Sequence, residues 1–305
     1  MMSHKTRYMA CVWPVAGREN LEVIENELQS VGKILFSKDI FLGYLGMRNF
    51  LIQIYGHQSW CGTVDNRYRG INEKLHMCFM DGQPIRTYLF EAESLEAVVE
   101  AKERIRGHFR LKKHSIHISD SESETNDMIR LLYNENSLQF LNVARPYQYK
   151  GVNARLQDIK KSIEEKGLDK DRFILGEGAV LELYGIQEAK DVFFLTDYHP
   201  NEIAELHGVT SYDEKERIYG QTISQILNDS KNYFYFSQMK VVSLECLLKA
   251  NEFLESTENS KRHKLYKMLM QQEQHPTMNL PVRAGIYCSR CFVKMKEAVR
   301  GLIGK

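Results

Sequence analysis

The chain has 305 residues, of which 43% are hydrophobic and 27% are charged, and its formal net charge at pH 7 is +1. This composition suits a globular protein of one large or two medium domains, and we expect two. The near-zero net charge argues against a protein that a global positive field holds on nucleic acid or on an acidic membrane.

The apolar and cysteine patterns argue against two further classes of protein. No stretch approaches 18 uninterrupted apolar residues, so we expect no membrane span. The first 17 residues lack the long apolar core of a secretory signal. Six scattered cysteines fit a reducing compartment better than a disulfide framework. These features together predict a cytoplasmic protein.

The first 145 residues alternate between predicted strands and helices. The apolar spacing at Leu21, Ile24 and Leu28 predicts a helix. The alternation of Ile116 and Ile118 with polar neighbours predicts a half-buried strand. Interleaved strands and helices indicate a mixed α/β or α+β layer. The expected strands cover residues 8–15, 34–42, 86–91 and 114–120, and the expected helices cover residues 20–31 and 47–55 and follow Ser94 and Ser121.

Two serines are expected to begin helices in this region. Ser94 is a candidate N-cap, and Ser121 with Glu124 has the spacing of a capping box. The residues expected to face inward from the first of these two helices are Leu95, Val98, Val99 and Ile105.

The alternating pattern stops around NVARPYQYKGVN, so we place a domain boundary near residue 148. The expected domains cover residues 1–148 and 149–305, and the fold class is α+β. The second domain is expected to contain helices over 154–166, near 213–227, after Ser243 and from about 260 to 271, an aromatic strand over 233–236, and a basic helix near the end of an irregular tail.

The most informative pattern in the second domain is RFILGEGAVLELYGIQEAKDVFFLTD, residues 172–197. It predicts an apolar strand, a turn at Gly176, Glu177 and Gly178, a helix, and a second strand that begins at Asp191. The backbone N–H groups of such a turn, near a helix N-terminus, can cradle phosphates. A later segment, QMKVVSLECLLKANEFLESTENSKRHKLYKML, predicts another strand followed by helices.

These two segments, in this order, resemble the nucleotidyltransferase superfamily of the polymerase-beta type over about residues 150–272. The resemblance implies a mixed sheet with flanking helices. It also implies that Gly176, Glu177 and Gly178 bind a nucleoside triphosphate, and that Lys190 takes the place of the basic residue before the acidic strand. The first 145 residues carry no such resemblance.

The resemblance further implies a magnesium site, from which this sequence departs. Asp191 is expected to be a catalytic carboxylate that holds Mg²⁺, which would clamp the attacking and leaving oxygens. Strand residues two apart point the same way, so Phe193 stands where a second carboxylate is expected. Glu177 is a candidate replacement ligand. The turn also lacks a hydroxyl that is often found there.

The function that the resemblance implies is transfer of a nucleotidyl or phosphoryl group to a small acceptor. A sugar intermediate of surface polysaccharide biosynthesis is one such acceptor. The alternative is a catalytically inactive module that binds a nucleotide or a glycan. A toxin-like member that modifies RNA is a further alternative, but the neutral charge and the lack of basic stripes weigh against nucleic acid as a partner.

The first domain carries candidate residues in KKHSIHISDSESE. His117 is a candidate catalytic acid or base near neutral pH, and Asp120 lies beside it, before a helix start. Lys113 adds positive charge for a substrate. The alternative is that Asp120 or Ser121 caps the helix and that His117 is a polar surface residue.

Two other motifs were weighed as binding sites. In GMRNFLIQIYGH, Arg48 and Asn49 follow a glycine at an expected helix start, where phosphate could bind, although Arg48 could equally be a surface charge. Cys288 and Cys291 have the spacing of a zinc half-site, but no second pair completes the four ligands, so a structural or incidental role is favoured.

Overall fold

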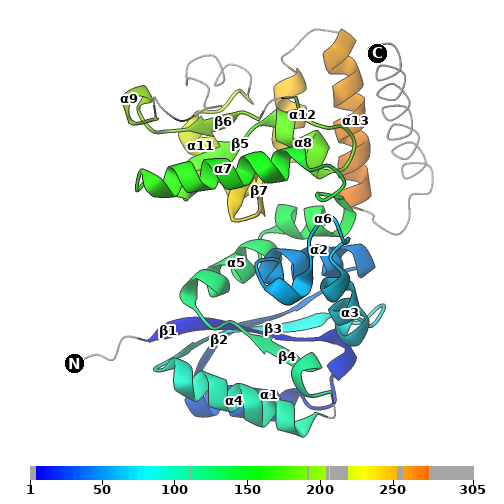
Figure 1. Cartoon of the computed structure of the whole chain (residues 1–305), viewed down its shortest axis with the longest axis vertical. Helices are drawn as coiled ribbons and strands as arrows, with labels where there is room; N and C mark the ends of the chain where they lie inside the picture. Colours follow the sequence, from blue (N-terminus) through cyan, green and yellow to red (C-terminus); the bar gives the residue numbers. More distant parts are fainter. Residues whose placement is uncertain are drawn as a thin grey trace. The chain divides into compact units, whose positions relative to one another are not determined.

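The computed structural model describes residues 5–109, 111–190, 192–203, 206, 219–252 and 257–274. Contacts divide the chain into two compact units, Met1–Tyr133 and Asn134–Lys305, each with its own sheet. Both units combine helices with a four-stranded sheet, as Figure 1 shows, so the fold is mixed α+β as expected. None of the described helices combines the length and the apolar character needed to cross a bilayer.

The boundary between the units lies earlier than the expected residue 148. Helix α6 (Glu135–Val143) follows the boundary, and its Phe140 and Val143 are buried in the core of the second unit. The loop around residue 148 has the composition of a linker but connects two helices of the same unit. Helix α6 therefore already belongs to the core of unit 2, although the sequence pattern changes only after this helix.

Unit 1 is built on an antiparallel sheet with strand order β2-β3-β1-β4. Helix α1 connects β1 to β2, and helix α4 connects β3 to β4, as in the β-α-β-β-α-β order of ferredoxin-like folds, but α2 and α3 are inserted between β2 and β3. The bounds are β1 (Thr6–Val12), α1 (Leu21–Val31), β2 (Gly32–Ile40), α2 (Tyr44–Tyr55), α3 (Arg69–Cys78), β3 (Ile85–Ala92), α4 (Leu95–His108), β4 (Ile116–Ile118) and α5 (Glu122–Leu132).

Helices cover both faces of this sheet. One core cluster joins strand residues such as Phe90 and Ile118 to Leu28 of α1 and Ile105 of α4. Figure 1 shows α1 and α4 on that face and α2 and α5 on the other. All three residues of β4 are therefore buried, and the expectation of a half-buried strand over 114–120 is wrong.

For α4, the structure confirms the predicted N-cap and contradicts part of the predicted buried face. The Ser94 hydroxyl accepts a hydrogen bond from the Ala97 amide at 3.2 Å, so the predicted cap is present. Val98 is buried, but Leu95 and Val99 are 37% and 41% exposed. The prediction that those two face inward is wrong, because α4 packs on the sheet along a narrower stripe than the apolar pattern suggests.

Unit 2 is built on a mixed sheet with strand order β6-β5-β8-β7. Strand β5 runs parallel to β8, and the other two pairings are antiparallel. The bounds are α7 (Gly151–Glu165), β5 (Phe173–Leu175), α8 (Glu177–Leu183), β6 (Phe194–Thr196), α9 (Pro200–Ile203), α11 (Ile223–Asn228), β7 (Tyr233–Phe236), β8 (Met239–Val242), α12 (Leu244–Glu252) and α13 (Thr257–Gln274).

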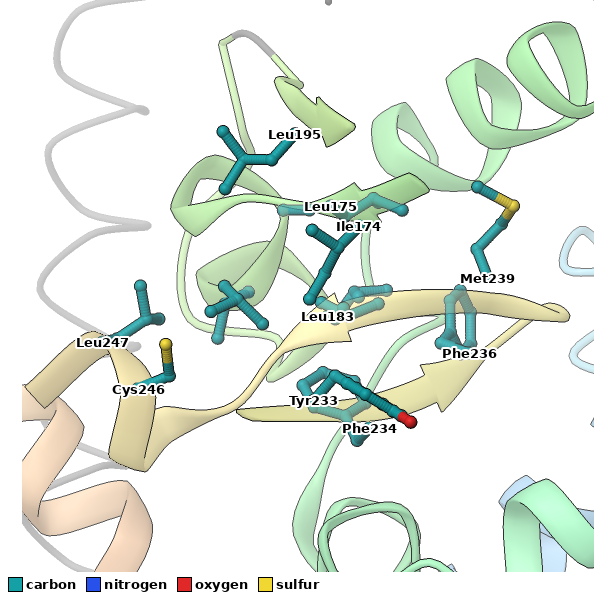
Figure 2. Close-up of a cluster of buried hydrophobic side chains, with 14 of the residues drawn as sticks. Ile174, Leu175, Leu183, Leu195, Tyr233, Phe234, Phe236, Met239, Cys246 and Leu247 are labelled. Atoms are coloured by element: carbon teal, nitrogen blue, oxygen red, sulfur yellow. The ribbon is translucent and has the colours of Figure 1, made fainter. Parts of the chain in front are cut away.

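The core of unit 2 forms because every residue of β5, β6 and β8 is buried. Figure 2 shows Ile174 and Leu175 of β5 beside Leu195 of β6, with Phe234 and Phe236 on the hairpin strand. Phe140 of α6 stacks on Phe234 with ring centroids 4.3 Å apart. Aromatic residues on both sides therefore fasten the first helix of the unit to its last hairpin.

The expected helices of the second domain are only partly within the described residues. The aromatic strand has the predicted bounds, and Ser243 accepts a hydrogen bond from the Cys246 amide at 3.2 Å at the start of α12. Of the helix expected near 213–227, residues 213–218 lie outside the described residues. The tail from residue 275, with Cys288, Cys291 and the basic helix, also lies outside them.

Candidate functional site

A pocket of about 330 Å³ opens in unit 2 where α8 begins. Gly176 follows β5, and α8 starts at Glu177, so Gly178 lies inside the helix rather than in a turn. The residues that line the pocket come from α8, the segment before β6, Tyr219 and α13, and the ones used below are Gly176, Glu177, Gly178, Lys190, Phe193, Tyr219, Arg262 and Tyr266.

The structure therefore brings together four residues that the sequence singled out: Gly176, Glu177, Gly178 and Lys190. Asp191 lies outside the described residues. Strand β6 begins at Phe194, not at residue 191 as expected. Phe193 precedes the strand, and its side chain is 41% exposed. Phe193 is not part of a strand, so the expectation that it shares a strand face with Asp191 does not hold for Phe193.

The backbone at the glycine turn is largely engaged within the protein. The Gly176 amide donates to the Phe193 carbonyl at 2.8 Å, as an extension of the β5–β6 ladder. A Cβ on Gly176 would lie 3.5 Å from that same carbonyl oxygen. Helix α8 has seven residues and presents the Glu177 carboxylate at its first position. The Gly176 amide is therefore not available to a phosphate, and we argue binding in this pocket from its side chains.

Glu177 is held by two residues of α13. The Tyr266 hydroxyl donates to Glu177 Oε1 at 2.6 Å, and Arg262 Nη1 lies 3.3 Å from the same oxygen. Burial, followed by the charge of Glu177, raises the pKa of Tyr266 well above its ordinary value. Tyr266 is therefore a permanent hydrogen-bond donor at neutral pH.

The described carboxylates of the pocket do not by themselves form a magnesium site, and Asp191, the other expected ligand, lies outside the described residues. The described residues contain no group of three His, Cys, Asp or Glu side chains that could hold a metal ion. Glu177, the expected replacement ligand, is paired with a cation instead of facing a second carboxylate. We therefore derive no metal-dependent step from the described residues.

Lys190 is positioned by a network beneath the pocket. Arg155 of α7 donates to the carbonyls of Ala189 and Lys190 at 2.6 and 2.7 Å. The buried carboxylate of Glu182 accepts from the amides of Ala189 and Val152 at 2.7 and 2.6 Å. The backbone before Lys190 is thus fixed from both sides, and the lysine side chain extends, exposed, at the edge of the pocket.

In unit 1, His117 is neither a surface residue nor an open acid–base group. It is 7% exposed, and its Nε2 lies 2.9 Å from Glu124 Oε1. Its ring stacks on Trp13 at 6.3 Å and meets the edge of Tyr55 at 5.1 Å. Burial lowers the pKa of His117 despite the opposing effect of Glu124. In this pair, a neutral His117 imidazole donates a hydrogen bond to the ionised Glu124 carboxylate.

Asp120 has a structural partner as well. Its carboxylate pairs with the Lys102 ammonium at 2.9 Å, and that ammonium also donates to the Ile118 carbonyl at 2.8 Å. Ser121, not Asp120, caps α5, because the Glu124 amide donates to the Ser121 hydroxyl at 3.1 Å. The Glu124 side chain bonds the Asp120 amide at 2.8 Å, so the reciprocal contact of the capping box is displaced by one residue.

Arg48 and Asn49 do not stand at a helix start. Helix α2 begins at Tyr44, so both residues lie beyond its first turn, and Asn49 is buried. Arg48 donates to the Asn72 side chain at 2.9 Å and to the Arg67 carbonyl at 3.1 Å. These contacts connect α2 to α3, and the premise of the phosphate-binding prediction, that the pair stands at a helix start, is wrong.

The sequence reasoning missed Tyr219, Arg262 and Tyr266 as pocket residues. The one available signal is the helical spacing of Arg262 and Tyr266, four apart and therefore on one face of α13.

No protein-family model matches the chain, and no curated protein is significantly similar to it in sequence. The geometry of the pocket is therefore the ground on which a function can be argued.

Proposed function

We propose that unit 2 binds a nucleotide in the pocket at the start of α8. The observation that carries this proposal is the exposed ring of Phe193 in a pocket that two cations, Lys190 and Arg262, also line. An aromatic face offers a base a stacking surface worth roughly 1–3 kcal/mol, and the cations suit the phosphates. The volume is also in the range of small-molecule sites.

The chemistry of Arg262 supports a role at the phosphate end of the ligand. A guanidinium carries five N–H donors in a planar fork that serves carboxylate and phosphate alike. Arg262 already meets the Glu177 carboxylate at 3.3 Å. Tyr266 holds that carboxylate at 2.6 Å, so Glu177 retains one partner when a phosphate oxygen competes for Arg262.

Binding of ATP, GTP, CTP and UTP to the full chain, with Mg²⁺ or Mn²⁺ present, tests this proposal by calorimetry. We expect Lys190→Gln to weaken binding of the preferred nucleotide about tenfold, which corresponds to about 1.4 kcal/mol. Lys231→Gln is the matched control, because Lys231 is an exposed lysine of the same unit outside the pocket. Absence of binding to any nucleotide, or equal weakening by both substitutions, contradicts the proposal.

Transfer of a nucleotidyl or phosphoryl group to a small acceptor, such as a sugar intermediate, is the second candidate function. The order of elements supports it: β5, the glycine, α8 and an antiparallel β6, followed later by β8, which lies parallel beside β5. The two segments that carry the family resemblance thus form neighbouring strands of one sheet.

Labelled nucleotide and a panel of sugar phosphates test the transfer reaction. If it occurs through the carboxylate that the resemblance implies, Asp191→Asn abolishes label transfer while nucleotide affinity changes little. Transfer that survives Asp191→Asn would remove that carboxylate from the reaction, and binding without any transfer would leave a nucleotide-binding module.

A further inference from the structure

A second pocket, of about 640 Å³, lies in unit 1, where α4 ends and the chain turns toward β4. It is separate from the nucleotide pocket and does not depend on the function proposed above. Its walls come from α3, from the last turns of α4, and from the 3₁₀ helix η3 (Lys112–His114) with the residue before it. The lining residues used here are Met77, Glu103, Arg106, Leu111, Lys113 and His114.

Positive charge collects around this pocket with little to offset it. Glu103 pairs with Arg106 Nη1 at 2.6 Å. Lys113 is exposed and has no acidic partner among the described residues. Lys74 lies nearby, with its ammonium 5.5 Å from the Trp13 ring and 5.0 Å from the Tyr55 ring. Two cations, Arg106 and Lys113, therefore line the pocket with one carboxylate, and Lys74 adds a third cation close to it.

The local pKa shifts agree with this excess of positive charge. Burial lowers the pKa of His114, and the charges of Lys74, Lys113 and Arg106 lower it further. Burial also lowers the pKa of Lys74, with contributions from Arg106 and Lys113. These cations are close enough to oppose one another, which is the situation that a bound anion relieves.

Arg106 also has an unused hydrogen-bond donor. Its Nε is buried and has no hydrogen-bond partner within the described part of the chain. A buried donor without an acceptor is costly, by about 1–3 kcal/mol. An acceptor oxygen brought by a ligand, with a small rotation of the guanidinium, would satisfy it.

We propose that this pocket binds a small organic phosphate. The phosphate group is held by Arg106, Lys113 and His114, and the apolar part of the ligand lies against Met77 and Leu111. A phosphate carries more negative charge than a carboxylate, so it offsets the positive charge of Arg106, Lys113 and the nearby Lys74 more fully. The apolar wall distinguishes the ligand from inorganic phosphate.

Phenyl phosphate, inorganic phosphate and benzoate, added to the full chain and followed by calorimetry, test the assignment. We expect phenyl phosphate to bind more tightly than either of the others. Lys113→Gln should weaken phenyl phosphate about tenfold. Met77→Ser should weaken phenyl phosphate but leave inorganic phosphate unchanged. Both positions are exposed, so neither change should impair folding.

Two matched controls locate the binding. Lys33→Gln removes the same charge from an exposed lysine of β2, and Lys190→Gln removes it from the pocket of unit 2. Lys33→Gln should leave phenyl phosphate binding unchanged, and Lys190→Gln, which alters the nucleotide pocket proposed above, should leave the tenfold effect of Lys113→Gln unchanged. Loss of binding in Lys190→Gln but not in Lys113→Gln would place the phosphate in unit 2 and overturn the proposal, as would absence of binding to the unaltered chain.

The pKa of His114 can be measured directly, and it should change only if phosphate binds beside the imidazole ring. The groups that face it are Cys78, whose Sγ lies 3.9 Å from Nδ1, and the cations Lys74, Arg106 and Lys113. A bound phosphate favours the imidazolium, so saturation with phenyl phosphate should raise the pKa of His114 in an NMR titration assigned with His114→Gln. An unchanged His114 pKa at saturation refutes the contact.

Discussion

The two units use their charged side chains in opposite ways. In unit 1 the two residues expected to be catalytic both form internal pairs: His117 with Glu124, and Asp120 with Lys102. In unit 2 the comparable set lines a pocket, where Lys190 and the ring of Phe193 are exposed. A cluster of polar residues in sequence therefore says little about function until the burial of each member is known.

The largest effect on stability is expected at Glu182, the buried carboxylate of unit 2 that accepts two backbone hydrogen bonds. Glu182→Ala leaves the amides of Val152 and Ala189 without their acceptor. We expect the free energy of unfolding of unit 2 to fall by about 3 kcal/mol, as measured by urea denaturation followed by circular dichroism. Glu188→Ala, at an exposed position that also lines the pocket, is the control and should have little effect. Similar stability of both variants would mean that Glu182 is not a structural residue.

The His117–Glu124 pair should reveal itself through pH. The folded pKa of His117 is lowered, so the unfolded chain takes up this proton first as the pH falls below about 6.5. Unit 1 should therefore lose stability from that pH downward, until the folded pKa is passed. His117→Gln should cost about 1–2 kcal/mol at pH 8 and remove the slope in that window. If the free energy of unfolding of the variant has the same pH dependence, another titrating group causes that dependence.

The exposed ring of Phe193 should behave differently from Glu182 and His117, because its removal should affect nucleotide binding without affecting stability. Phe193→Ala is expected to weaken nucleotide binding about tenfold, through the loss of roughly 1–3 kcal/mol of stacking. Phe41→Ala removes a ring of unit 1 that is also exposed, and it should leave the affinity unchanged. Calorimetry on the two variants decides between a stacking surface and a ring that is merely exposed.

The smallest effect is expected at Asp120. Its carboxylate is 63% exposed, and ion pairs of this kind contribute little. Asp120→Ala should lower the stability of unit 1 by less than about 1 kcal/mol, and any transferase activity should be unchanged. A large loss of activity at unchanged stability would return Asp120 to a catalytic role.

The local parts of the fold were predictable because their patterns are local. The aromatic strand Tyr233–Phe236 and helix α1 follow from alternation and helical spacing that a short window contains. The burial of His117 was not predictable in this way. Its strand alternates like a half-buried one, but α2 and α5 cover the second face, and that packing is decided by segments far away in the sequence.

The candidate site also contains residues that a local sequence pattern predicts and residues that it does not. Gly176, Glu177, Gly178 and Lys190 belong to one continuous motif and were found together. Arg262 and Tyr266 reach the pocket from α13, about 85 residues later, through contacts with Glu177. Nothing in a short window links those positions, so only the folded chain identifies them.

Both tryptophans of the chain, Trp13 and Trp60, belong to unit 1. Trp13 is buried and stacked on His117, and Trp60 packs on Tyr55 with its indole N–H donating to Gln58. Indole fluorescence therefore reports the unfolding of unit 1 alone, whereas circular dichroism reports both units. Protonated imidazole quenches indole emission at contact distance, so the same signal also follows the charge on His117. The unaltered chain thus carries its own optical probe, by which the two units can be observed separately without a label.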